Sequence, residues 1–239
     1  MTQSPNSPAE PTSGATAPLS QLLESVVTEK ELSYWRLQQE ILVVAHHDTE
    51  LIFASLSGPS ITTFSDRLAS NHAMLSRHLR QHDLPAQEAI MVPAGSYDHA
   101  ARFADAHGGA LTARWEMLLD STVNLAADTF YRDWEAFVAE QPDHAGEIVL
   151  QPVKPAERTV VAVAYGHTWV VDGTEDHTAQ DAAKHAIATL PHAAYGLVEV
   201  AAGLVTEVDL TFRSWNDPEP PPMARDVAQA IVDGELKDV

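Results

Sequence analysis

The stretch "RTVVAVAYGHTWVVDG", residues 158–173, decides the fold class, because it ends the helical periodicity that dominates the chain before it. Its valines and aromatic residues predict two strands with a bend near Gly166, and Asp172-Gly173 is typical of a turn. Further along, "TEVDLTF" (206–212) alternates polar and apolar residues with a period of two. This alternation predicts another strand with one polar and one apolar face.

Helices are predicted around these strands. Residues 174–190 are rich in alanine and predict a helix that ends before Pro191. The proline-rich residues 218–222 predict an extended spacer, followed by a short C-terminal helix at about 223–234. We therefore expect an α+β region over 146–239, with helices covering one face of a small antiparallel or mixed sheet.

The preceding part of the chain, residues 19–141, has mainly helical periodicity. Apolar residues over 61–83 share one face at helical spacing. Over 111–141 they recur every three or four residues, which predicts a long amphipathic helix. The apolar residues of this second stretch are Trp115, Leu119, Val123, Ala126, Phe130, Trp134 and Phe137. The expected fold class is therefore α+β, with an N-terminal antiparallel helical region followed by the sheet layer.

The composition limits the partners and the location. The chain has 34 Asp and Glu against 14 Lys and Arg, a formal net charge of −20, which disfavours binding to nucleic acid and to anionic membranes. It has no cysteine, which excludes disulfides, thiolate catalysis and cysteine-based zinc sites. No apolar run is long enough for a membrane span, and residues 1–18 lack the features of a secretory signal and predict a disordered tail. We expect a cytoplasmic protein.

The stretch "ILVVAHHDTELIF", residues 41–53, places two histidines and two acidic residues inside an apolar run. Two structures fit residues 31–57, a helix or a hairpin that turns at the histidines. The flank "EKELSYWRLQQE" consists of good helix formers and favours the helix, which we expect. Val43, Val44 and Leu51 lie off the helical face and favour the hairpin, which remains the alternative.

A candidate metal site follows from the helix. His46 and Glu50 are four residues apart and would point the same way. An antiparallel helix pair about "SGPS" (57–60) would put His72 opposite His46 and Arg67 opposite Glu50. His46, Glu50 and His72 are thus the candidate metal ligands, and Zn, Fe or Mn would suit them. The alternative, which we favour, is a salt bridge between Glu50 and Arg67, with no cofactor bound.

The segment "VVAHHDTEL", residues 43–51, resembles the "AHPDDE" motif of the zinc deacetylases that act on N-acetylglucosaminyl groups, with Thr49 in place of a zinc-binding aspartate. It also resembles the metal-binding helix of DinB-like bundles, with His78 and His82 in place of the later histidines. Each resemblance covers fewer than ten residues, and no activity is transferred from it.

No complete catalytic signature is present in the sequence: there is no G-x-S-x-G, P-loop, G-x-G-x-x-G after a strand, or H-E-x-x-H. Together with the amphipathic helices and the acidic surface, this favours a non-catalytic protein-interaction or assembly module that binds a protein partner or another copy of itself. The alternative is a metal-dependent enzyme or metal-binding helical bundle. Mimicry of DNA is a third reading, based on the negative charge alone.

Overall fold

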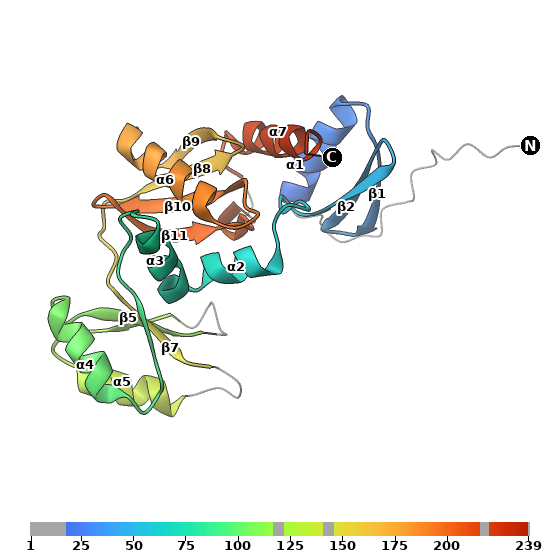
Figure 1. The fold of residues 1–239 in the computed structure, drawn as a ribbon. Helices are drawn as coiled ribbons and strands as arrows, with labels where there is room; N and C mark the ends of the chain where they lie inside the picture. Colours follow the sequence, from blue (N-terminus) through green and yellow to red (C-terminus); the bar gives the residue numbers. More distant parts are fainter. Residues whose placement is uncertain (1–17, 117–121, 141–145, 216–219, 239) are drawn as a thin grey trace, which may run out of the picture.

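The fold is built on three antiparallel sheets with helices packed against them (Figure 1). The computed structural model describes residues 18–116, 122–140, 146–215 and 220–238. The N-terminal sheet has the order β1-β2-β3, the central sheet β11-β10-β8-β9, and the small-unit sheet β4-β7-β5-β6. The strands are β1 (Ser33–Gln38), β2 (Ile41–His46), β3 (Thr49–Ala54), β4 (Ile90–Val92), β5 (Leu111–Trp115), β6 (Val123–Leu125), β7 (Ile148–Pro152), β8 (Thr159–Ala164), β9 (His167–Asp172), β10 (Tyr195–Ala201) and β11 (Leu204–Asp209). The helices are α1 (Pro18–Glu29), α2 (Thr63–Ser70), α3 (His72–Gln81), α4 (Tyr97–Ala106), α5 (Phe130–Ala139), α6 (His177–Thr189), α7 (Ala224–Glu235) and the 3₁₀ turn η1 (Arg213–Trp215).

The central sheet is covered on both faces. Successive residues of β8 point to opposite faces and belong to two different cores. Ala162 and Ala164 belong to the core formed with α1, α7 and the N-terminal sheet. Val161 and Val163, on the opposite face, belong to the core formed with α2, α3 and α6. The turn from β8 to β9 consists of Tyr165 and Gly166. Both have positive φ angles, 47° and 83°, as tight hairpin turns that follow strand twist require. The predicted α+β class is confirmed, but helices cover both faces of this sheet and not one.

The N-terminal sheet replaces the helix that we expected over 31–57. Residues 33–54 form a three-stranded antiparallel meander, and His46 pairs with Thr49 across the β2–β3 turn. Val43 and Val44 point to opposite faces of β2, and both are buried. Branched residues that are buried on both faces suit a strand better than an amphipathic helix, so the hairpin was the better reading.

The other long helices of the expected N-terminal bundle are also shorter or absent. The predicted helix at 61–83 is divided into α2 and α3 by Asn71, whose side chain caps α3 by accepting hydrogen bonds from two backbone N–H groups. Among the described residues of the predicted helix at 111–141, only α5 is helical, because residues 111–115 and 123–125 form strands β5 and β6. Apolar residues spaced by four share a face in a strand as well as in a helix, so this pattern did not discriminate between them. The prediction of an N-terminal helical bundle was therefore wrong.

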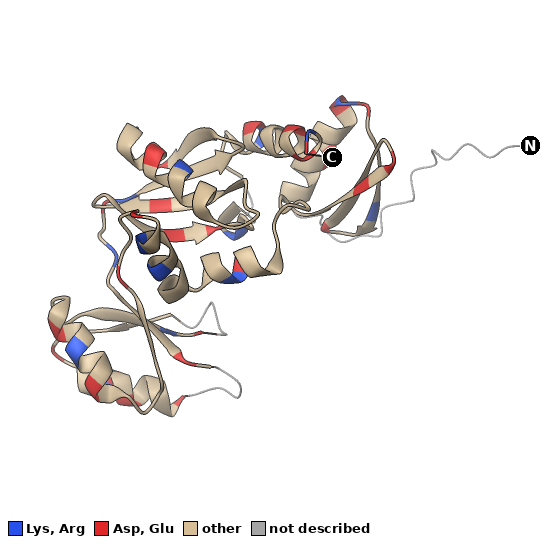
Figure 2. Ribbon diagram, in the orientation of Figure 1, with Lys and Arg blue, Asp and Glu red and all other residues tan. Residues whose placement is uncertain are grey.

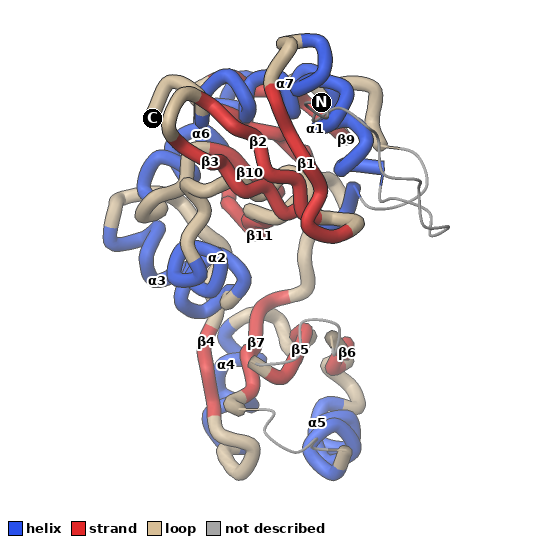
Figure 3. Tube along the Cα trace, turned by 90° about the vertical axis from the view of Figure 1, so that its right-hand side faces the viewer, coloured by secondary structure: helices blue, strands red, loops and turns tan. Residues whose placement is uncertain are grey.

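Residues from β4 to β7 form a small α+β unit inserted between α3 and β8. Helices α4 and α5 pack on its sheet. In Figure 3 this unit lies below the central sheet. Its core consists of its own residues, with Trp115 and Phe137 stacked at a centroid distance of 5.1 Å. Two neighbouring connections join it to the rest of the protein, since Gln87 Nε2 donates a hydrogen bond to the carbonyl of Pro152 at 2.8 Å. The small unit is thus a separate packed body on a double connection.

A buried polar network joins the N-terminal sheet to the central sheet and α7. The hydroxyl of Tyr195 in β10 accepts a hydrogen bond from the Gly58 N–H at 2.6 Å and donates one to Glu235 at 3.0 Å. Ser60 also donates to the Glu235 carboxylate, from both its backbone and its side chain. These bonds fix the linker that follows β3 against the C-terminal helix.

The ends of the chain conform in part to the predictions. The C-terminal helix is present as α7, at 224–235. Residues 1–17 of the predicted tail and residues 218–219 of the predicted spacer lie outside the described residues, and residues 220–222 of the spacer are in neither a helix nor a strand. In the described part of the chain, none of the helices is long and apolar enough to cross a membrane. Figure 2 shows acidic residues on all parts of the ribbon, in keeping with the negative charge.

Candidate functional site

A cleft of about 390 Å³ lies where the central sheet meets α2, α3 and the small unit. We call it the central cleft. Its volume is within the range of small-molecule sites. The residues that line it are Asp66, Ser70, His72, Arg114, Arg158, Val160, Leu197, Glu199, Glu207, Val208, Asp209, Arg213 and Ser214. Most are polar or charged, and both signs of charge are present.

Two carboxylates meet on the central sheet at the floor of this cleft. Glu199 of β10 and Glu207 of β11 are direct cross-strand partners, and Leu197 and Asp209 are the next pair on the same face of the sheet. Like charges that face each other across two strands repel and destabilise the pair unless cations lie nearby. Glu199 is only 8% exposed, so its charge needs particularly close compensation.

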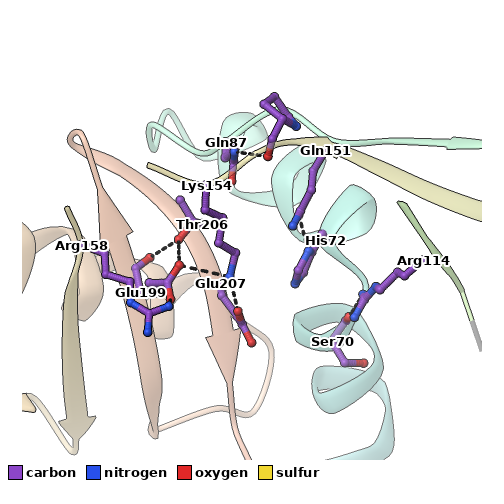
Figure 4. Close-up of polar contacts among 11 residues, drawn as sticks. Ser70, His72, Gln87, Arg114, Gln151, Lys154, Arg158, Glu199, Thr206 and Glu207 are labelled. Atoms are coloured by element: carbon purple, nitrogen blue, oxygen red, sulfur yellow. Dashed lines mark hydrogen bonds and ion pairs between the residues drawn. The ribbon is translucent and has the colours of Figure 1, made fainter. Parts of the chain in front are cut away.

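The cations that compensate this pair come from the connection between β7 and β8. Lys154 Nζ lies 3.1 Å from Glu199 Oε1 and also forms an ion pair with Glu207. Arg158 Nη1 lies 2.7 Å from the other oxygen of Glu199. Thr206 Oγ1 donates a further hydrogen bond to Glu199 Oε1, at 2.7 Å. Figure 4 shows Lys154 placed between the two carboxylates.

The two acidic residues of β11 differ in their environments. Burial acts to raise the pKa of Glu207, but its ion pair with Lys154 and the nearby His72 and Arg114 outweigh burial and hold that pKa below its usual value. Asp209 accepts hydrogen bonds from the backbone and hydroxyl of Thr211, both at 2.8 Å. It therefore shapes the loop after β11, while Glu207 stays ionised beside the cleft.

Arg114 of β5 is the main basic group on the small-unit side of the cleft. Its side chain donates a hydrogen bond to the carbonyl of Ser70, which fixes its position relative to α2. The residue is 8% exposed, and its Nε has no hydrogen-bond partner among the described residues. Burial lowers the pKa of this guanidinium, yet arginine remains charged at any physiological pH. A guanidinium that lines a cleft and is largely shielded from water is suited to binding an anion.

His72 stands at the first turn of α3, between Arg114 and the central sheet (Figure 4). One ring nitrogen is hydrogen-bonded to the side chain of Gln151 in β7. Burial, and then the positive charge of Arg114, lower the pKa of His72 to about 4, against the opposing effect of Glu207. The imidazole is therefore neutral near pH 7 and adds a hydrogen-bonding group, not a charge, to the cleft.

The structure separates the three residues that the sequence suggested as metal ligands. His46 and Glu50 lie at the β2–β3 turn of the N-terminal sheet, whereas His72 lines the central cleft. No group of three or more His, Asp or Glu side chains able to hold a metal occurs within the described ranges. The favoured salt bridge between Glu50 and Arg67 is also not found, because Arg67 lies 3.5 Å from Glu116. The metal assignment depended on the helix at 31–57 and is without support once that helix is replaced by strands.

The sequence analysis did not single out the cations and buried carboxylates of the cleft. Glu199 carried one usable signal, since a single carboxylate inside the apolar run "YGLVEVA" indicates a buried charge that needs a partner. Glu207 had been placed on the polar face of its strand, but that pattern is equally typical of a solvated surface. Lys154, Arg158 and Arg114 carry no local signal, because the fold alone brings them to the cleft.

In this chain a four-stranded antiparallel sheet faces a smaller α+β unit across a charged cleft. Solved structures that resemble it include the ATP-grasp ligase PsnB and a D-alanine-D-alanine ligase. The fold is therefore ATP-grasp-like. No family model matches the chain, and no curated protein matches it. The two short resemblances at 43–51 have no support from these comparisons.

Three structures illustrate the likeness. The ATP-grasp ligase PsnB, in complex with a phosphomimetic variant of its minimal precursor, Mg and ADP, is 14% identical over 72% of this chain and 61% of its own, with a TM-score of 0.53. The D-alanine-D-alanine ligase from Coxiella burnetii is 14% identical over 72% of this chain and 58% of its own, with a TM-score of 0.54. The VanG D-Ala:D-Ser ligase from Enterococcus faecalis is 11% identical over 74% of this chain and 63% of its own, with a TM-score of 0.53.

These findings correct the leading functional prediction. A non-catalytic interaction module was expected, but the similar structures are of ligases, and the predicted helical bundle is not formed. At 11–14% identity the likeness establishes the fold only. The chain also spans about three fifths of the length of the ligases, 58–63% in these three.

Proposed function

We propose that the protein binds a magnesium–nucleotide complex in the central cleft and acts as an ATP-dependent ligase. The observation that carries this proposal is that a buried arginine, Arg114, and the cross-strand carboxylate pair Glu199 and Glu207 line the same cleft. A metal–nucleotide complex has both matching parts: phosphate oxygens for the arginine and a divalent cation for the carboxylates. The PsnB structures with Mg and ADP and with AMPPNP support the same ligand class.

The side chains of the cleft fit this ligand chemically. Mg²⁺ prefers oxygen donors and, in nucleotide sites, is held by only one or two carboxylates together with substrate phosphates. The absence of a three-residue metal cluster in the described chain is therefore compatible with the proposal. Glu199 and Glu207 would hold the ion. When bound, it would neutralise phosphate charge and orient the nucleotide.

The other groups have distinct roles in this proposal. Arg114 lines the cleft and binds a phosphate oxygen through its guanidinium, and its bond to the Ser70 carbonyl keeps the guanidinium in place. His72 is neutral near pH 7 and offers a hydrogen bond without adding to the positive charge. Arg158 neutralises the buried Glu199 from the side opposite Lys154.

A polypeptide is the partner that we propose for the second substrate. A solved structure of PsnB contains its precursor peptide PsnA2. A peptide substrate would also agree with the protein partner expected from the sequence. The net charge of −20 favours a basic or neutral peptide over an acidic one.

The proposal is tested by calorimetric titration of the full chain with Mg²⁺–ADP. Arg114→Met should raise the dissociation constant by about tenfold or more, because a charged hydrogen bond contributes about 1.5–3 kcal/mol. Arg114→Lys should recover part of the affinity through its charge. Glu207→Gln should remove most of the magnesium dependence of binding.

Arg102→Met provides the matched control, because Arg102 is exposed on α4 and bonds only locally, to the Asp98 carbonyl at 3.0 Å. It should bind Mg²⁺–ADP like the unmodified chain. The proposal would be refuted by a chain that binds no Mg²⁺–ADP at millimolar concentration, or by binding that neither Arg114→Met nor Glu207→Gln changes. Phosphate release from ATP on addition of candidate peptides would then identify the substrate.

A further inference from the structure

Lys154 occupies the space between the two carboxylates that the proposed function assigns to the metal ion. Its Nζ is 3.1 Å from Glu199 Oε1 and is ion-paired with Glu207 Oε2. The Lys154 side chain is 22% exposed, so its ammonium is largely enclosed by the groups that it neutralises. An ammonium is a compact point charge, and a divalent cation bound to both carboxylates would compete for the same position.

The carboxylates are not equally available to an incoming ion. Glu199 has a 9% exposed side chain and retains Arg158, at 2.7 Å, and Thr206, at 2.7 Å, when Lys154 is removed. Glu207 is 44% exposed on its side chain, and its ion pair is with Lys154. Loss of Lys154 therefore frees Glu207 for a ligand while Glu199 stays positioned.

The position of Lys154 in the chain determines where its ammonium can go when a metal ion displaces it from the carboxylates. Lys154 lies two residues after β7 ends at Pro152, on the connection that returns from the small unit to the central sheet. When its ammonium leaves the carboxylates, the backbone of Lys154 keeps it near Glu199 and Glu207, which line the same cleft as Arg114. Phosphate oxygens are the natural partners for a cation displaced to that place.

We propose that Lys154 is an internal counter-ion that excludes free divalent metal from the Glu199–Glu207 pair and yields only to a metal that arrives with a nucleotide. This inference rests on the proposed function, because it assigns to Lys154 the selection between free metal and metal–nucleotide. Free metal must displace an ammonium that then has no partner. A metal–nucleotide complex also brings phosphates. The metal can then bind the two carboxylates while the ammonium of Lys154 binds a phosphate, so that no charged group is left without a partner.

The experiment measures the binding of Mn²⁺ to the full chain in the absence of nucleotide. Binding is followed by the decrease of the electron paramagnetic resonance signal of free Mn²⁺. The unmodified protein should bind Mn²⁺ weakly, and Lys154→Met should lower the dissociation constant by about tenfold or more, as expected when an ion pair in a shielded site no longer competes. Lys154→Gln serves as a second neutral variant if the methionine variant fails to fold. Adding Glu207→Gln to either variant should abolish the gain.

Lys184→Met is the matched control, because Lys184 is exposed on α6 and is not among the residues of the cleft. It should leave Mn²⁺ binding unchanged. The inference is overturned if the unmodified chain and both Lys154 variants bind free Mn²⁺ equally while all of them bind Mn²⁺–ADP. If none binds Mn²⁺–ADP, the proposed function itself fails, and this inference fails with it.

Discussion

Replacing Tyr195 by phenylalanine should destabilise the protein strongly, although it removes a single oxygen atom. The Tyr195 side chain is fully buried, and its hydroxyl accepts a hydrogen bond from the Gly58 N–H at 2.6 Å and donates one to Glu235 at 3.0 Å. The variant leaves a buried backbone N–H without its acceptor and a buried carboxylate with one donor fewer. Burial and the nearby Glu235 also raise the pKa of Tyr195, so the phenol stays protonated and able to donate.

The expected loss follows from these two bonds. A neutral hydrogen bond contributes about 1 kcal/mol and one to a charged group about 1.5–3 kcal/mol, so we expect a loss of about 3 kcal/mol in the free energy of unfolding. For a chain of 239 residues this corresponds to a fall of about 6–12 °C in Tm.

Urea denaturation followed by tryptophan fluorescence measures the change, because Trp215 lies in the same core as Tyr195. Tyr131→Phe is the matched control: Tyr131 is 55% exposed and its hydroxyl bonds to Glu135 at the surface, so its loss should change stability by less than about 0.5 kcal/mol. Equal, small effects of the two substitutions would refute the argument that the buried network stabilises this junction.

Two further predictions concern packing and protonation. Gly234→Ala should lower the free energy of unfolding, measured by urea titration, by about 1–3 kcal/mol, because the added Cβ would overlap the ring of Tyr165. Gly95→Ala is the control: there is open space around Gly95, so this substitution should leave the free energy of unfolding unchanged. His72→Gln should reduce the dependence of the free energy of unfolding on pH. Burial and Arg114 lower the pKa of His72 from 6.5 to about 4. Between these two pH values the unfolded chain therefore binds a proton that the folded chain does not. The free energy of unfolding of the unmodified chain should therefore rise by on the order of 2 kcal/mol between pH 4.5 and pH 7. Urea titrations at these two pH values, without metal, measure this rise. If His72→Gln showed the same rise, the lowered pKa of His72 would not be its cause.

The strands after residue 158 could be predicted because their composition and turns agree with one another. In β8 and β9, valines dominate and the turn at Gly166 lies where the chain reverses. The N-terminal half could not be predicted in the same way. Its apolar residues recur at spacings such as four, which a helix and a strand both satisfy, and only pairing with distant segments distinguishes the two. The β5–β7 pairing, for example, joins Ala113 to Leu150.

The candidate site depends even more on distant pairing. Glu199 and Glu207 are close in sequence, and a hairpin alone brings them together. Arg114 reaches the cleft, and Lys154 reaches the carboxylates that line it, only because the small unit folds back on the central sheet, and nothing in the residues around them indicates this. His72 was identified as a candidate for the wrong reason: it was paired with His46, whereas its neighbours are Gln151 and the cleft.

The small unit enters and leaves the chain at adjacent points, with Ile90 paired to Leu150 just inside the junction. Its core contains none of the residues that hold the central sheet to its helices. A change in the core of the small unit should therefore leave the register of the central strands unaltered. The two walls of the central cleft are thus supported by separate cores: the wall that carries Arg114 by the core of the small unit, and the wall that carries the carboxylates by the packing of the central sheet.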